Sequence, residues 1–138
     1  MNFPLLLKQV KASIKLYKDA LVLLHDEPQS SLTSSTATSR IEQAKSYFEI
    51  AMDLDPMNPC VWTGLGLSLF FIATAPNTDK YNKSHKSLLL FEAIQHFTTA
   101  ASYYHKGNRE ETNDDTIAMQ RSCWYNAAFC YIHLQHYS

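Results

Sequence analysis

Apolar residues recur at alternating steps of four and three over the first part of the chain, the spacing that places them on one face of a helix. These residues are Phe3, Leu7, Val10, Ile14, Tyr17, Leu21 and Leu24. We therefore predict one helix over residues 4–26. A row of lysines runs beside the apolar row, at Lys8, Lys11, Lys15 and Lys18. The favoured interpretation is a packed surface helix with its lysines in water; a helix that lies on a membrane or pairs as a coiled coil is the alternative.

Polar residues interrupt this pattern over residues 27–38, which are rich in serine and threonine. Because the segment lacks apolar periodicity, it is predicted to be a mobile loop that is dispensable for folding. Ser39 and Glu42 then have the spacing of a capping box, so a second helix is predicted to begin at about Arg40 and to stop before Pro56. Its inward residues are Ala44, Phe48 and Ala51.

Residues typical of helix ends mark three further predicted helices. Asn58 is a good N-cap and Pro59 a good first residue for a third helix, which runs to about Ala75. After a short loop, a fourth helix ends at Gly107, a suitable left-handed terminator, and a fifth covers residues 114–136. The inward residues of the fourth helix are Leu89, Ala93, Phe97, Ala100 and Tyr104.

Composition narrows the class of protein. Only 3 of the 138 residues are glycine, which favours long helices in a single domain over residues 1–138 rather than a turn-rich β fold. The net charge of −1 provides no basic field for a nucleic-acid backbone, and no apolar run is long enough to span a membrane. The apolar start is too short for a signal peptide, and the odd number of cysteines, 3, favours reduced thiols. A cytoplasmic protein is therefore predicted.

The sequence contains no catalytic or metal-binding motif that would indicate an enzyme. The sequence contains no phosphate-binding loop, dinucleotide fingerprint or nucleophile elbow. Cys130, His133 and His136 follow one another at three-residue steps, yet zinc needs a fourth ligand at a suitable spacing, and none is evident. The acidic residues over 110–115 lack the alternating ligands of a calcium loop. We predict no catalytic residue, no metal and no cofactor.

The second and third predicted helices together carry a pattern that resembles the tetratricopeptide repeat. The matching residues are Ala44, Phe48, Ala51, Pro56, Trp62, Leu65, Gly66 and Leu69. Further matches are Ala93, Phe97 and Ala100, then Trp124, Ala127, Ala128 and Tyr131. The connections are longer than the usual period of roughly 34 residues. The resemblance implies an all-α fold of about five helices, in which antiparallel hairpins stack in a right-handed superhelix. It also implies that four aromatic residues are core, namely Trp62, Phe97, Trp124 and Tyr131; the alternative is that they line a ligand pocket.

Proteins of this family bind partners in a concave groove lined by the first helix of each repeat. By resemblance, the groove residues here are Lys18, Val22, Thr63, Leu67, Phe70, Tyr125, Phe129 and Ile132. Chaperone-binding members use a polar clamp, but Val22 and Gly64 stand where that clamp has asparagines, and Asn126 where it has a basic residue. The expected function is therefore a protein-interaction scaffold that binds an apolar segment or helix. The alternative is a structural subunit held permanently in a larger assembly.

By resemblance, the last predicted helix is the first helix of a third repeat, and we expect that repeat to be incomplete here, either because the sequence is part of a longer array or because another subunit supplies the second helix. Tyr131, Leu134 and Tyr137 recur on the last predicted helix at three-residue steps. Because an uncovered end of a repeat array exposes apolar surface, we predict that these three residues form a docking face for another protein. The rival interpretation is that this helix folds back onto the fourth one and that the face is core.

Overall fold

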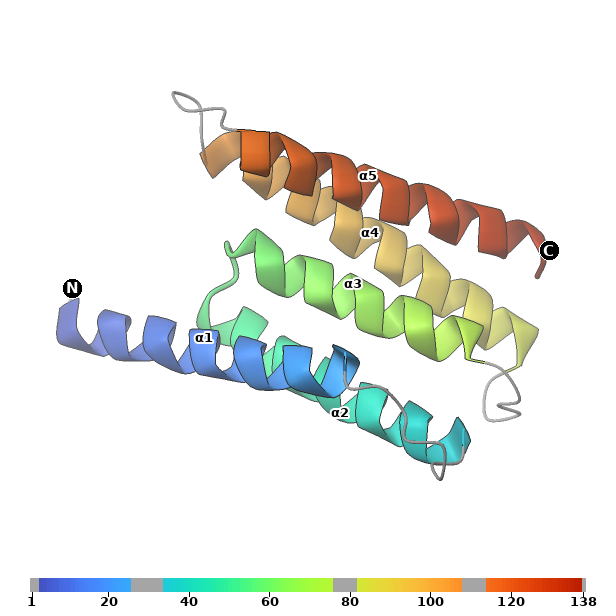
Figure 1. The fold of residues 1–138 in the computed structure, drawn as a ribbon, viewed down its shortest axis with the longest axis horizontal. Helices are drawn as coiled ribbons and strands as arrows, with labels where there is room; N and C mark the ends of the chain where they lie inside the picture. Colours follow the sequence, from blue (N-terminus) through green and yellow to red (C-terminus); the bar gives the residue numbers. More distant parts are fainter. Residues whose placement is uncertain (1–2, 26–33, 76–81, 108–113, 138) are drawn as a thin grey trace.

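A computed structural model describes residues 3–25, 34–75, 82–107 and 114–137. All the regular structure in these ranges is helical (Figure 1). The helices are α1 (Phe3–His25), α2 (Ser34–Leu54), α3 (Pro59–Thr74), α4 (Lys83–Gly107) and α5 (Asp114–Gln135). The predicted all-α class with about five helices is confirmed.

Two helix starts show how local sequence sets the boundaries. The Asn58 side chain accepts a hydrogen bond from the Cys60 backbone N–H at 3.0 Å, and Pro59 opens α3, as predicted. Asn82 plays the same part for α4, since its side chain accepts a bond of 2.8 Å from the backbone N–H of His85. Side-chain acceptors of this kind satisfy N–H groups that have no partner within the helix.

The predicted start of the second helix is wrong. α2 begins at Ser34, so Ser39 lies inside the helix rather than at its cap. Serine, threonine and alanine are tolerated within helices, so a capping-box spacing does not stop a helix from extending further upstream. Residues 34–38 of the predicted mobile loop are therefore helical, while its remaining part, 27–33, lies outside the described residues.

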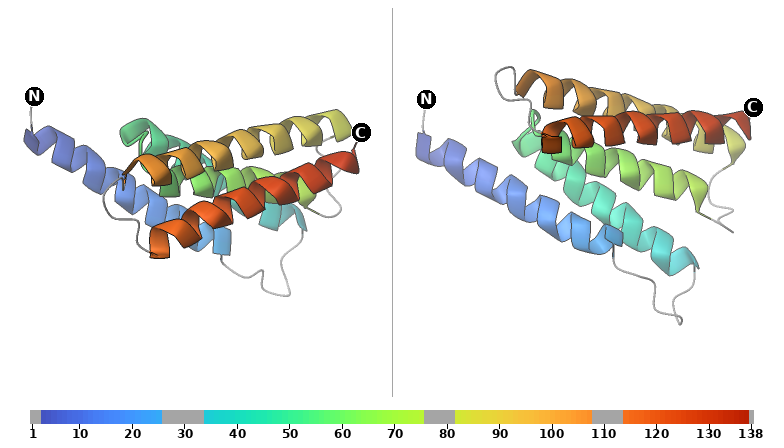
Figure 2. Two further views of the ribbon diagram at one scale, coloured as in Figure 1. Left: turned by 90° about the horizontal axis from the view of Figure 1, so that it is seen from above. Right: turned by 45° about the horizontal axis from the view of Figure 1, so that its top comes forward.

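Consecutive helices run in opposite directions and pack side by side in chain order (Figures 1 and 2). In the described ranges, α3 is the helix whose backbone approaches all four others, most extensively α4 and then α2. The backbones of α1 and α2 stay apart from those of α4 and α5. The helices therefore form an open row rather than a closed bundle.

Two main apolar clusters fill the row, one on each side of α3. The first lies among α1, α2 and α3, around the fully buried ring of Phe48. The second lies among α3, α4 and α5 and includes Leu69, Leu90 and Phe97. Two glycines of α3 face these rings, since a Cβ on Gly64 would meet Phe48 and a Cβ on Gly66 would meet Phe97. Small residues on α3 thus let large rings from both neighbouring helices pack against its backbone.

The prediction of four aromatic core residues holds only in part. Phe97 is buried, but Trp124 and Tyr131 are 52% and 56% exposed. The buried side of α5 consists of small residues instead, at Cys123, Ala127 and Cys130. The repeat pattern places Ala128 and Tyr131 of α5 at positions equivalent to two residues of α3 that α4 covers. No described helix covers Ala128 and Tyr131 in the same way.

Trp62 also departs from the predicted core position, because it is half-buried and packs on α4. Its ring centroid lies 5.3 Å from that of His96 and 6.2 Å from that of Tyr103. Its indole Nε1–H donates a hydrogen bond of 2.6 Å to the carbonyl oxygen of Pro56. Trp62 therefore ties the turn that precedes α3 to the α3–α4 interface.

Candidate functional site

An apolar hollow of about 400 Å³ lies between α3 and α5, with Phe97 of α4 in its lining. The lining residues are Leu67, Phe70, Phe71, Phe97, Asn126, Phe129 and His133. Its volume falls in the range of about 300–1,000 Å³ that is typical of ligand pockets. We call this hollow the α3–α5 groove. Its lining is mainly aromatic, with an amide and an imidazole as its polar groups.

The walls of the groove follow from the composition of α3, which is apolar around most of its circumference. One side of the helix packs on α2 and another on α4, so Leu67, Phe70 and Phe71 remain half-buried. The ring of Phe70 packs edge-on against His133 of α5, with centroids 5.2 Å apart, and lies 5.9 Å from the ring of Phe71. The contact between Phe70 and His133 joins α3 to α5 at the groove.

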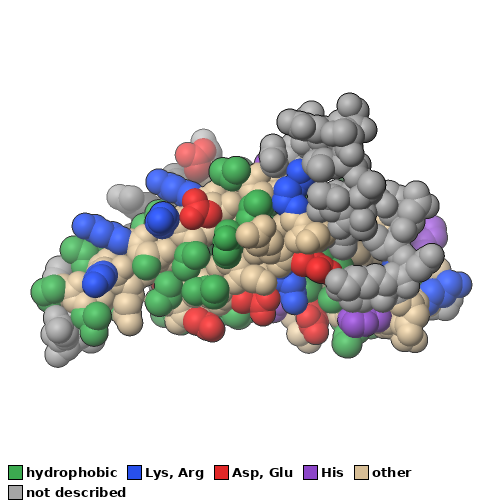
Figure 3. Space-filling model, turned by 90° about the horizontal axis from the view of Figure 1, so that it is seen from below, with side chains coloured by type: hydrophobic (Ala, Val, Ile, Leu, Met, Phe, Trp, Pro, Cys, Tyr) green, Lys and Arg blue, Asp and Glu red, His purple; other side chains and the backbone are tan. Residues whose placement is uncertain are grey.

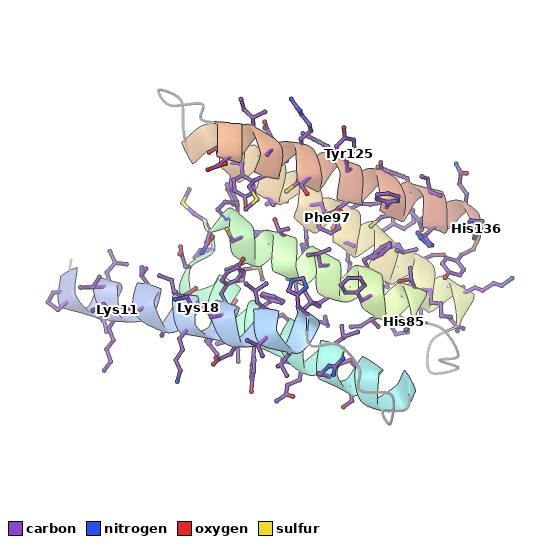
Figure 4. All side chains as sticks on the ribbon, in the orientation of Figure 1. Lys11, Lys18, His85, Phe97, Tyr125 and His136 are labelled. Atoms are coloured by element: carbon purple, nitrogen blue, oxygen red, sulfur yellow. The ribbon has the colours of Figure 1, made fainter. Side chains whose placement is uncertain are left out.

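Three of the eight predicted groove residues line this hollow together, namely Leu67, Phe70 and Phe129. Tyr125 and Ile132 lie one turn before and after Phe129 and are 62% and 53% exposed. The labelled Tyr125 is seen on α5 in Figure 4, with Phe97 between α3 and α4.

The other three predicted groove residues lie elsewhere. Thr63 is half-buried; its hydroxyl donates a hydrogen bond of 2.9 Å to the carbonyl oxygen of Pro59 and lies 3.6 Å from the Cys123 Sγ. Lys18 and Val22 are exposed on α1, which contributes no residue to the hollow.

Four lining residues were missed by the sequence analysis, and helical spacing could have identified three of them. Phe71 lies four residues after Leu67, while Asn126 and His133 lie three before and four after Phe129. Residues at these spacings share a helix face. The fourth, Phe97, was assigned to the core, and it is both buried and part of the groove.

A second hollow, of about 320 Å³, lies on the side of the molecule where α4 and α5 meet. Its lining residues are Ser87, Phe91, Tyr131, Leu134 and Gln135. Two residues of the predicted C-terminal docking face, Tyr131 and Leu134, therefore lie together here. The third, Tyr137, turns inward, where its hydroxyl donates a hydrogen bond of 3.4 Å to the carbonyl of Ala73.

Thiols and phenols near the helix interfaces are held in their neutral forms. Burial raises the pKa of Cys123 and raises that of Cys130 to about 12. Burial also raises the pKa of Tyr104, whose hydroxyl lies 3.3 Å from the Cys60 Sγ. A protonated thiol is a poor nucleophile and a poor metal ligand. Cys123 and Cys130 are also buried within apolar clusters, to whose packing they contribute.

The metal candidate of the sequence analysis can be placed as well. Cys130 is buried against the core, and the rings of His133 and His136 lie 6.2 Å apart. Across the described ranges, no group of three or more histidine, cysteine or acidic side chains is arranged to hold a metal ion. Within the same ranges, no helix is both long and apolar enough to cross a membrane.

Comparison of the chain with protein-family models, curated proteins and solved structures finds no significant match. The functional assignment therefore rests on the residues of this chain.

Proposed function

We propose that this protein is a helical-repeat interaction module, similar to tetratricopeptide-repeat proteins, that binds an apolar helix or extended segment of a partner protein in the α3–α5 groove. The observation that carries the proposal is the clustering of Leu67, Phe70 and Phe129 around one open apolar hollow. The open row of antiparallel helices supports the superhelical stacking that the proposal includes.

The chemistry of the groove favours an apolar partner over a charged one. Among the described residues, its lining contains no lysine, arginine or acidic residue, so a carboxylate or phosphate would lose its hydration without gaining a countercharge. A leucine or phenylalanine side chain that enters the groove gains about 1.5–3 kcal/mol from burial. Asn126 and His133 can exchange hydrogen bonds with the polar groups of such a partner. We infer binding without catalysis, in the cytoplasm, and without a cofactor or direct nucleic-acid contact.

Two phenylalanines provide a matched test. Phe129 lines the α3–α5 groove and is 56% exposed, whereas Phe91 lines the second hollow and is 54% exposed. Helical peptides selected from a display library against the full chain serve as the probe, with affinity measured by fluorescence polarisation. We expect Phe129→Glu to weaken binding at least tenfold, equivalent to about 1.4 kcal/mol, and Phe91→Glu to leave it unchanged. Equal affinities for both variants would refute the groove assignment.

The structural-subunit alternative is supported by a different surface. Trp124, Tyr131 and Phe91 each expose more than half of their side chains around the second hollow and along α5. Exposed aromatic clusters of this kind are typical of protein interfaces. A permanent assembly through this surface predicts that the isolated chain self-associates or aggregates, and that Phe91→Glu relieves this while Phe129→Glu does not. Sedimentation over a range of concentrations measures the difference.

A further inference from the structure

The first helix extends beyond the helix that it packs against. The Ser13 hydroxyl donates a hydrogen bond of 2.9 Å to the carbonyl of Ala51, which aligns the two antiparallel helices at that point. α2 ends only three residues later, at Leu54, so its end lies level with about Val10 of α1. Residues 3–9 therefore project past α2 by roughly 10 Å at 1.5 Å per residue, as the dark blue end of α1 shows in Figure 1.

Large apolar side chains are exposed on and beside this projecting segment. Leu6, Leu7 and Ile14 are 42%, 45% and 41% exposed. Leu7 and Ile14 are seven residues apart and therefore share one side of α1, whereas Leu6 lies on the side of the buried Ser13. An exposed apolar row of this kind beside a row of lysines is typical of helices that lie at a membrane interface.

Positive charge is concentrated along the same helix. Residues 1–18 contain four of the 12 lysines and arginines and none of the 13 acidic residues, so the rest of the chain, with 8 basic and 13 acidic residues, has a net charge of −5. The four lysines are Lys8, Lys11, Lys15 and Lys18, and all are exposed. They follow steps of three, four and three, which place them on one side of α1, opposite the buried residues Ser13 and Ala20.

The figures show this combination of side chains. At the projecting end of α1, Figure 3 shows lysine and hydrophobic side chains next to one another on the surface. Figure 4 labels Lys11 and Lys18 along the length of the helix. The two kinds of side chain are therefore available to the same flat partner.

From this geometry we propose that the N-terminal half of α1 binds an anionic lipid surface. Leu7 and Ile14 enter the boundary between headgroups and acyl chains, while the lysine row beside them contacts lipid phosphates and carboxylates. Lysine stems lie along apolar surface and place their ammonium groups at headgroup level, so one helix can make both contacts. An anionic bilayer meets both rows at once, because its headgroups attract the ammonium groups and its acyl chains take up the apolar side chains.

The test uses the full 138-residue chain and co-sedimentation with vesicles. One set contains equal parts of phosphatidylserine and phosphatidylcholine, and the other contains phosphatidylcholine alone. We expect binding to the anionic vesicles, weakened by salt, and little binding to the neutral ones. Removing one lysine near an anionic surface lowers partitioning about fivefold, so Lys11→Gln with Lys18→Gln is expected to lower it about 25-fold. Leu7→Gln with Ile14→Gln is expected to lower the binding that remains at high salt, where the contribution of charge is screened.

Matched controls test whether vesicle binding depends on α1 in particular or on charge and exposed apolar side chains in general. Lys83→Gln with Arg121→Gln removes the same charge from exposed residues of α4 and α5. Leu88→Gln with Phe91→Gln removes comparably exposed apolar side chains from α4. Equal loss of binding in these controls would overturn the proposal. It is also overturned if the chain does not bind anionic vesicles. If Leu7→Gln with Ile14→Gln then abolishes self-association in sedimentation, the occupant is a second copy of the chain. Circular dichroism verifies that each variant is folded.

Discussion

Adding one methyl group at Gly64 tests the packing of the first cluster, because two effects of opposite sign compete there. Alanine in the middle of a helix is more stable than glycine by about 0.5–1 kcal/mol. A Cβ at Gly64, however, would lie under 3.0 Å from three ring atoms of Phe48, a separation that real Cβ atoms essentially never show. The sign of the measured change decides whether Phe48 can move.

The surroundings of Phe48 indicate that it cannot move cheaply. Its side chain is fully buried, and its ring lies 6.0 Å from that of Tyr17 on α1. Forcing an extra carbon into a well-packed core costs about 1–3 kcal/mol. After subtracting the gain in helix propensity, we expect Gly64→Ala to lower the free energy of unfolding by about 1–2 kcal/mol, or the melting temperature by roughly 3–6 °C.

Urea denaturation followed by circular dichroism measures this change, and a second substitution identifies its cause. Leucine at residue 48 lacks the outer ring atoms that the new methyl group meets. In the Phe48→Leu background, Gly64→Ala is therefore expected to be neutral or to stabilise the protein by up to about 1 kcal/mol. If Gly64→Ala is neutral or stabilising in the otherwise wild-type protein, the reasoning is refuted and this core is loosely packed.

Two further predictions concern titratable groups. Burial lowers the pKa of His96 below its ordinary value of 6.5, outweighing the opposing effect of nearby Glu92. The folded protein then binds fewer protons than the unfolded chain as the pH falls below 6.5, so stability should decrease there. In His96→Gln this dependence should be weaker, and equal slopes in urea titrations would contradict the assignment. For the thiols, we expect iodoacetamide to modify half-buried Cys60 first, and Cys130 only on opening of the helices; mass spectrometry that found Cys130 modified first would contradict its burial.

The fold was predictable where a local signal and the packing pattern agreed. Asn58 and Pro59 fix the start of α3 through a hydrogen bond between neighbouring residues, so the sequence alone suffices. Ser39 offered a signal of equal quality, yet the residues before it are also compatible with a helix. A cap is therefore informative mainly when the preceding residues, such as Pro56 and Met57, interrupt the helix.

The candidate site was less predictable, because it depends on how α5 lies against α3. Leu67, Phe70 and Phe129 were placed together by the repeat pattern, and the structure groups them. The pattern also placed Trp124 in the core, because it assumes that each helix is covered on both sides. In the described chain α5 is covered on one side, and Trp124 is left exposed. Tertiary neighbours, rather than the residues of a helix, decide which of its apolar rows is buried.

The central position of α3 has a consequence for how the protein loses its structure. Since the backbones of α1 and α2 do not approach those of α4 and α5 in the described ranges, the two outer pairs share stability mainly through α3, with Ile41 of α2 as a side-chain contact to the α3–α4–α5 cluster. Such a linear arrangement separates easily into regions that open at different free energies. Amide exchange should be slowest in α3 and α4, whose mutual contact is the most extensive, and faster in α1. The α1–α2 hairpin can thus detach while the other three helices remain assembled. We therefore expect this hairpin to unfold first under force or heat.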